Sequence, residues 1–398
     1  MSSMINAEDD LKQSLKFLYP LLRIIGAWPN PISASSSSKI FERFLIFLTY
    51  FLLTLLLVPG ILHILAKETN SRRQMKLFMP HINVICQLFK YTIVLCRMDE
   101  FRKIMNELKK DWLTVTDENR QIFRAKAQIG HKVMIVIMLT IYTGGISYRT
   151  ILPLSVGRIV LPNNTTIRLL PCPSYFIFFD EQATPNYELI FTLQVLSGFF
   201  TYTVVCGTVG ICTILCLHTC GQLSILANKM TELTNQVDIS EDAVQKKIVD
   251  IVEYRTKIKK FLKRVEQISP YLCFFEIINV TGIACTIGYC IIMEWEDSNA
   301  TAILIYLLLQ MNCVFINFSM CYVGQLLIDE SDNVKKVSAT FHWYRFPTKK
   351  ARYLILVIIM SNYQMKLTAG KVVDVSLATF TDIVKASMGY LNVLRNTF

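Results

Sequence analysis

Long apolar stretches separated by charged segments dominate the chain. A helix needs about 20 mainly apolar residues to cross a bilayer. Six stretches meet this requirement and predict six transmembrane helices; their residues are 44–66, 77–96, 133–154, 188 to past Leu217, 271–293 and 300–328. The second and fourth segments between these spans are long and polar. Apolar residues at spacings of 3 and 4 predict a helix in the fourth segment, and we expect the second to be helical as well.

The C-terminal part of the chain contains two weaker apolar runs. Residues 353–360 are too few to span a bilayer and follow the cationic segment RFPTKKAR, so we place them in the cytosol or at the membrane interface. Residues 376–395 form a longer run that polar residues interrupt. On a helix these interruptions form one narrow stripe with Val393 at its edge; they are Asp382, Lys385, Gly389, Asn392 and Asn396.

Three interpretations of this striped helix are open from the residues alone. It is a soluble amphipathic helix, a helix lying on the membrane surface, or a seventh span whose polar stripe faces water. A surface-lying helix usually carries several Lys or Arg on its polar face, whereas this stripe has one Lys balanced by Asp382. A span keeps polar residues where they line an aqueous path or the bundle interior. A pore would require several copies of this helix around an axis.

Charge placement predicts the orientation of the spans. The chain has a net charge of +11, yet only 18% of its residues are charged, below the about 25% of soluble domains. With the N-terminus in the cytosol, 31 of the 41 Lys and Arg residues fall in cytosolic segments, as the positive-inside rule requires. This asymmetry accounts for the basic charge without a nucleic-acid partner. The same topology places sequons at Asn163, Asn164 and Asn299 outside, and we expect glycosylation at Asn163 and Asn164.

The chain lacks the usual motifs of catalysis or cofactor binding. It has no Gly-rich phosphate loop, HExxH or GxSxG motif, and its twelve Cys include no CxxC pair. The His residues are scattered over different elements, so we expect no catalytic residue, metal site or cofactor. Within the second span, Lys90 and His81 have two interpretations: they mark a polar site in the membrane, or Lys90 extends its ammonium group to the cytosolic interface.

The C-terminal segment carries a specific set of motifs. It reads FHWYRFPTKKARYLILVIIMSNYQMKLTAGKVVDVSLATFTDIVKASMGYLNVLR. The W-Y-x-F-P start, the KKAR cluster, KLTAG, SLATF and the final Y-x-x-V-L resemble the C-terminal signature of insect odorant receptors. The segment PCPSYFIFFDEQATPNYELIFTLQ resembles the outer loop of these receptors as it enters their fourth span. The chain lacks the long second intracellular insertion of the shared co-receptor, so it resembles a tuning subunit.

The resemblance implies an all-α membrane protein with seven transmembrane helices, a cytosolic N-terminus and an extracellular C-terminus. The seventh helix is split into a cytosolic half and a pore-lining half. Such a receptor forms a heterotetramer with the co-receptor in the dendritic plasma membrane of a sensory neuron, and a small volatile ligand opens a non-selective cation channel. The implied domains are a cytosolic N-terminal segment, a six-helix ligand-binding bundle with cytosolic extensions, a subunit-contact segment and a pore helix, at 1–43, 44–328, 329–375 and 376–398.

Two sets of site residues follow from the resemblance. Alignment on Y-x-x-V-L places the pore gate at Val393, with Asn396 one turn further out and Asn392, Asp382 and Lys385 along the same helix. Ligand contacts in the family come from the outer halves of spans two, three, four and six. No motif fixes these contacts, and our candidates are large side chains or close-approach residues at suitable depth: Gly145, Tyr148, Phe199, Tyr202, Tyr306 and Met311.

Three other functions remain alternatives. A G-protein-coupled receptor also has seven spans, but its N-terminus is outside, which would place the 31 basic residues outside as well. A gustatory receptor has the same architecture and takes contact ligands, although KLTAG and SLATF favour the odorant branch. A transporter or membrane enzyme would require a functional polar centre shared among the spans.

Overall fold

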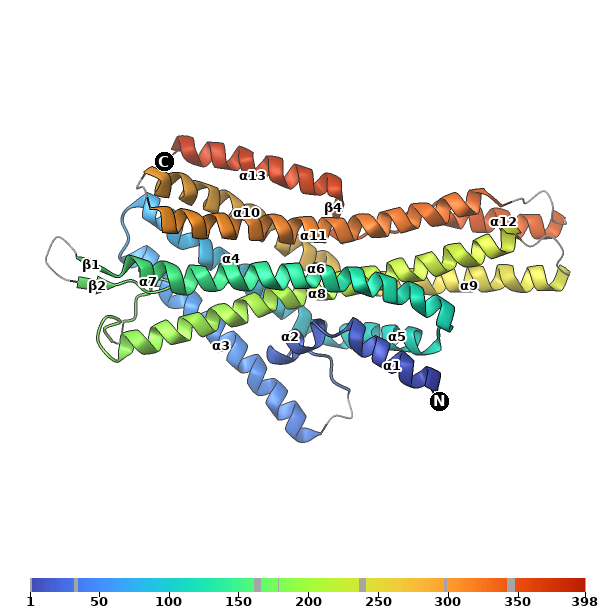
Figure 1. The fold of residues 1–398 in the computed structure, drawn as a ribbon, viewed down its shortest axis with the longest axis horizontal. Helices are drawn as coiled ribbons and strands as arrows, with labels where there is room; N and C mark the ends of the chain where they lie inside the picture. Colours follow the sequence, from blue (N-terminus) through green and yellow to red (C-terminus); the bar gives the residue numbers. More distant parts are fainter. Residues whose placement is uncertain are drawn as a thin grey trace.

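The protein is an elongated helical bundle (Figure 1). The computed structural model describes residues 2–31, 35–160, 166–177, 179–235, 241–296, 299–341 and 348–397. Its helices are α1 (Ser2–Ser14), α2 (Leu18–Ile24), α3 (Ser36–Ala66), α4 (Ser71–Cys96), α5 (Met98–Thr114), α6 (Asp117–Ile146), the π-helical turn η1 (Ser147–Ile151), α7 (Leu152–Val156), α8 (Asn186–Asn235), α9 (Glu241–Val265), α10 (Ser269–Glu296), α11 (Ala300–Ala339), α12 (Thr348–Ser361) and α13 (Leu377–Thr397).

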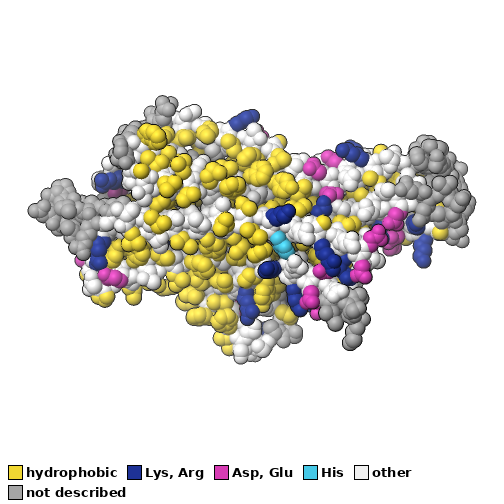
Figure 2. Space-filling model, in the orientation of Figure 1, with side chains coloured by type: hydrophobic (Ala, Val, Ile, Leu, Met, Phe, Trp, Pro, Cys, Tyr) yellow, Lys and Arg dark blue, Asp and Glu magenta, His cyan; other side chains and the backbone are white. Residues whose placement is uncertain are grey.

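Six of the described helices are long and apolar enough to cross a membrane: α3, α4, α6 with its continuation, α8, α10 and α11. They coincide with the six predicted spans, and α5 and α9 confirm the helices predicted in the two long polar segments. Figure 2 shows apolar side chains over the middle and left of the visible face. Charged side chains gather mainly at the right, where α5, α9 and α12 lie in Figure 1. We call this the charged end; it is the end predicted to be cytosolic.

Several of the apolar helices continue as polar helices toward the charged end. α6 begins at Asp117, α8 runs to Asn235 and α11 runs to Ala339, because polar residues replace apolar ones there without breaking the helix. The domain limits predicted at residues 43 and 328 therefore fall inside α3 and α11. α8 is the central helix; its middle part is buried, and it packs against α2, α3, α4, α6, α9 and α11.

The seventh span is split, as the resemblance implied. A short hairpin of β3 (Thr368–Ala369) and β4 (Val373–Asp374) separates α12 at the charged end from α13. Gly370 and Lys371 both have positive φ at its turn. Gly370 donates its N–H to Pro270 O at the start of α10 (2.8 Å). A Cβ atom on Gly324 of α11 would lie 2.2 Å from Val375 O, so only glycine permits this approach.

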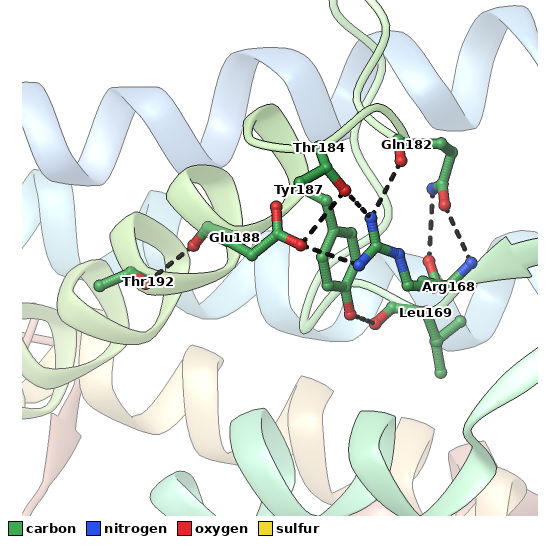
Figure 3. A network of polar contacts seen from close by, with 7 residues as sticks. All are labelled: Arg168, Leu169, Gln182, Thr184, Tyr187, Glu188 and Thr192. Carbon is green, nitrogen blue, oxygen red and sulfur yellow. Dashed lines mark hydrogen bonds and ion pairs between the residues drawn. The ribbon is translucent and has the colours of Figure 1, made fainter.

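A second hairpin lies at the opposite end of the molecule, with β1 (Arg158–Val160) paired to β2 (Thr166–Arg168). Figure 3 shows how Arg168 fastens this loop to the start of α8. Its guanidinium group lies 4.0 Å from the ring centroid of Tyr187, pairs with Glu188 at 2.9 Å and donates to Gln182 O and Thr184 Oγ1. Cation–π contact and ion pairing together hold Arg168 of β2 against the start of α8. The sequence patterns did not predict either hairpin.

A buried polar cluster joins three helices at the charged end. The Asp111 carboxylate of α5 accepts from Gln222 Nε2 (2.6 Å), pairs with His218 (3.2 Å) and binds Lys257 of α9. Burial alone would raise the pKa of Asp111, but hydrogen bonds from His218 and Lys257 outweigh burial and hold this pKa below its usual value. Because the folded-state pKa is lowered, the stabilisation is present at neutral pH and is lost as the pH falls below about 4.

We predict that Asp111→Ala destabilises the protein. The substitution removes the carboxylate acceptor of the buried Gln222 Nε2 and the buried partner of His218, at a cost of about 1–3 kcal/mol. Asp99→Ala on the same helix is the matched control, because the Asp99 side chain is exposed and, within the described residues, its ion pair is with Arg102 three residues away. Thermal unfolding of the detergent-solubilised protein should show a clearly lower midpoint for Asp111→Ala. Equal midpoints for the two variants would contradict the structural role of the cluster.

Candidate functional site

A cavity lies inside the bundle, among α4, α6, η1, α8, α10 and α11. Its volume is about 80 Å³, several times the about 10–15 Å³ that one water molecule requires. Most of its surface is apolar, with a few polar side chains; the lining residues are Met79, Pro80, Asn83, Ile141, Tyr148, Arg149, Tyr202, Val205, Glu276, Asn279, Val280, Ile283, Ile287, Leu309, Asn312, Cys313 and Ile316. An apolar hollow with few polar groups is the usual form of a small-molecule site.

The π-helical turn η1 positions two side chains of the cavity wall. A π turn widens the helix locally and changes the direction of the residues that follow it. Tyr148 and Arg149 lie in this turn and both line the cavity. Arg149 Nε donates to Tyr202 Oη (3.1 Å), and Tyr202 donates to Gly145 O (3.1 Å). The phenol ring of Tyr202 lies so close to Gly145 that a Cβ there would be 2.3 Å from Cζ. Gly145 therefore sets the position of the ring.

The predicted ligand contacts fall at different places. Tyr148 and Tyr202 line the cavity, and Gly145 supports Tyr202 from behind. Tyr306 is buried, with its ring centroid 6.3 Å from that of Tyr148. Phe199 is partly exposed and packs against Tyr142, whose ring centroid lies 5.5 Å away. All of these residues lie in the same half of the bundle.

Met311 differs from the other candidates. It is about half exposed, on the surface of α11. None of the six contacts is tested by a bound ligand, so all remain predictions as ligand contacts.

The polar groups of the cavity include one that the sequence analysis did not identify. Glu276 of α10 lines the cavity and forms an ion pair with Lys90 of α4, and both side chains are almost completely buried. Lys90 therefore does not reach the interface, and the polar-site interpretation describes it correctly. The signal was present in the sequence: Glu276 and Asn279 stand three residues apart in an apolar run, which places both on one helical face.

His81, the other candidate polar residue of the second span, has a packing role. Its side chain is buried, with Nδ1 2.7 Å from Leu77 O. A Cβ on Gly60 of α3 would lie 1.8 Å from His81 Nε2. The imidazole ring thus fills the space that the absent Gly60 side chain leaves between α3 and α4.

α13 carries the second candidate site. Its apolar face packs on α10 and α11: Ile383 is buried, Leu391 lies against Gly288, and Phe380 meets Phe318 edge to face at 5.6 Å. The opposite face is exposed along its length. That face carries the predicted pore residues Asp382, Lys385, Asn392 and Val393, and Val393 is 61% exposed.

Three predicted residues cannot be placed in this description. Asn163 and Asn164 lie outside the described residues. Asn396 belongs to the last turn of α13, but its side chain also lies outside the described part of the structure. The glycosylation sites and the outermost pore residue therefore stay predictions.

The arrangement of the whole chain matches that of a solved receptor. The insect olfactory receptor OR5 from Machilis hrabei in complex with eugenol superposes with a TM-score of 0.81 over 99% of this chain and 100% of that chain, at 13% identity. A second structure of the same receptor gives a TM-score of 0.80. At this identity the likeness shows a shared fold.

Sequence relatives of this chain come from insects. Odorant receptor 10 of Aedes albopictus is 19% identical over 60% of this chain, odorant receptor 85b of Drosophila melanogaster is 22% identical over 53%, and odorant receptor 13a of that species is 23% identical over 55%. The chain matches 63%, 53% and 59% of the length of these relatives. The family model described as 7tm Odorant receptor matches residues 72–388. Because this match covers most of the chain, the protein belongs to the seven-transmembrane odorant receptor family.

Proposed function

We propose that this chain is the tuning subunit of an odorant-gated, non-selective cation channel, assembled as a heterotetramer with a shared co-receptor. A small volatile molecule binds in the cavity among α4, α6, α8, α10 and α11. The observation that carries this proposal is that cavity, because it is mainly apolar and lies among the helices of a membrane bundle. Membership of the odorant receptor family favours this function over a transporter, a membrane enzyme or a G-protein-coupled receptor.

Burial of apolar surface would supply most of the binding energy. Each Å² of apolar ligand surface that leaves water contributes roughly 25 cal/mol. A wall dominated by Ile, Val, Leu and Met side chains distinguishes neighbouring homologues only weakly, by about 1–3 kcal/mol per methylene. The few polar residues of the wall would then decide which functional groups are accepted.

The exposed stripe of α13 supports a pore between subunits. Its apolar face is already covered by α10 and α11, whereas the stripe with Asp382, Lys385 and Asn392 is open. Lipid would not solvate these groups, but four such helices around an axis would line an aqueous path with them. We assign 376–398 to the pore, 329–375 to subunit contacts, and the plasma membrane of a sensory dendrite as the location.

The same two helices connect the cavity to the pore helix. Val280 of α10 and Cys313 of α11 line the ligand cavity and also line the cleft where α13 packs. A ligand that spreads α10 and α11 therefore changes the surface on which α13 rests. Differential contacts of this kind shift an equilibrium between closed and open states.

Heterologous expression tests the proposal. Cells that express this chain with the co-receptor should give cation currents when a panel of volatile compounds is applied. Cells that express the co-receptor alone with the same panel are the control. A tagged chain that reaches the cell surface with the co-receptor and gives no current with any volatile would refute the proposal.

Gly145→Ala should reduce sensitivity to every activating odorant. The added methyl group displaces the Tyr202 ring into the cavity and disturbs Arg149, and overpacking of this kind costs about 1–3 kcal/mol. We expect the half-maximal concentration to rise about tenfold. Gly144→Ala is the matched control, because the nearest atom to its Cβ is Leu309 Cδ2 at an ordinary 3.5 Å. An unchanged dose–response curve for Gly145→Ala would show that the part of the cavity wall formed by Tyr202 does not contribute to ligand binding.

Val393→Ala should alter the closed state of the channel. A smaller side chain at a constriction lets water and ions pass more easily, so we expect a larger current without odorant. Val58→Ala is the control, because this exposed valine lies on α3, which packs on α4 and α8 and not on α13 in the described part of the chain. The variants should be combined with matching co-receptor substitutions, since the pore would contain helices from both chains. Unchanged basal current and ion selectivity in those combinations would contradict the pore assignment.

A further inference from the structure

Buried hydrogen-bond acceptors without partners collect on the wall of the ligand cavity. Within the described part of the chain, Glu276 Oε1, Asn279 Oδ1 and Asn312 Oδ1 have no hydrogen-bond partner. All three residues line the cavity, and Glu276 and Asn279 are more than nine-tenths buried. A buried polar atom that lacks a partner has lost its hydrogen bond to water without gaining another, which destabilises the empty cavity. A ligand that supplies the missing donor would therefore regain this energy on binding.

Glu276 determines the direction of the missing hydrogen bond. An amide can turn to present either its oxygen or its NH₂ group, so Asn312 adapts to a donor or an acceptor. An ionised carboxylate can only accept. Lys90 occupies Glu276 Oε2, which leaves Oε1 as an acceptor on the cavity wall.

Several of the donors on this wall are already engaged. Tyr202 donates its hydroxyl hydrogen to Gly145 O, and Arg149 directs Nε to Tyr202 and Nη1 to Gln194 O. Asn279 Nδ2 donates to Asn83 Oδ1 at 3.2 Å. With these donors engaged and Glu276 Oε1 without a partner, the wall favours a ligand that donates a hydrogen bond over a ligand that can only accept one.

The charge balance further restricts the ligand. Lys90 and Glu276 form a neutral pair in a buried site. A cationic ligand would leave a net positive charge there, and an anionic ligand would repel Glu276; an uncompensated buried charge is costly. Resting on the function proposed above, we propose that the cavity selects neutral molecules that carry a hydroxyl or a comparable hydrogen-bond donor, and binds their ethers and other acceptor-only counterparts more weakly.

Isomeric odorants test this selectivity without a change in size. Para-cresol and anisole are isomers, as are heptanol and methyl hexyl ether, and only the first member of each pair donates a hydrogen bond. In cells with the native chain and the co-receptor, we expect the donor isomer of the pair that fits to have a half-maximal concentration about 10- to 100-fold lower. This is the range that one hydrogen bond to a charged group supports.

Substitutions then assign the preference to Glu276. Glu276 alone should not be replaced, because Lys90 would be left as a buried unpaired charge. The double variant Lys90→Met/Glu276→Met removes both charges and keeps similar volumes; we expect its preference for the donor isomer to fall to about twofold or less. Gln310→Met is the matched control. Gln310 Oε1 also has no partner among the described residues, but this residue lines the cleft beside α13, so the preference should be unchanged.

The outcomes separate this inference from the proposed function. Equal responses to the two isomers of every active pair would overturn the selectivity and leave the receptor function intact. Absence of current and of thermal stabilisation with every volatile tested would overturn both. If the double variant does not reach the cell surface, Asn312→Leu provides the second test. A decrease in the donor preference with Asn312→Leu, but not with Gln310→Met, supports the assignment to this wall, and equal preference in both variants contradicts it.

Discussion

Every polar group that enters the hydrocarbon layer must find its partner within the protein, because lipid offers none. The backbone meets this condition by forming helices. Side chains meet it only in the interior, so the Lys90–Glu276 pair, the Asn83–Asn279 contact and the Arg149–Tyr202 contact all lie between helices. The same constraint makes the exposed stripe of α13 informative, since its polar groups have no comparable cover from α10 or α11.

The interior polar groups also shape the cavity. Tight apolar packing would fill the space among α4, α6, α8, α10 and α11 with side chains. Charged and amide groups held by specific partners cannot collapse into such a space without losing those bonds. Lys90 fixes one oxygen of Glu276, and Arg149 together with Gly145 fixes Tyr202. The hollow is thus bounded by side chains whose positions are set from behind, which is what pre-organised recognition requires.

The spans were predictable from sequence because hydropathy depends on local composition. The six long apolar runs became α3, α4, α6, α8, α10 and α11, and the periodic stripe at 376–395 became the exposed face of α13. Contacts between distant residues were not predictable. Lys90 was recognised as unusual, but its partner Glu276 is 186 positions away. Tyr148 and Tyr202 were chosen by depth, a criterion that also selected Met311 on the surface of α11. The depth of a residue in the membrane does not determine whether its side chain points into the bundle or toward its surface.

The hairpin β3–β4 gives α13 an uneven attachment. At its inner end, Gly370 bonds to the start of α10, Val375 N–H bonds to Leu367 O, and Val375 O fits against Gly324. Toward the other end, the described contacts are side-chain contacts such as Leu391 on Gly288. Backbone contacts therefore fix the start of α13, whereas the rest of the helix packs mainly through side chains. If α13 tilts about its fixed start, the displacement increases along the helix and is greatest at its C-terminal end, in the region of Val393.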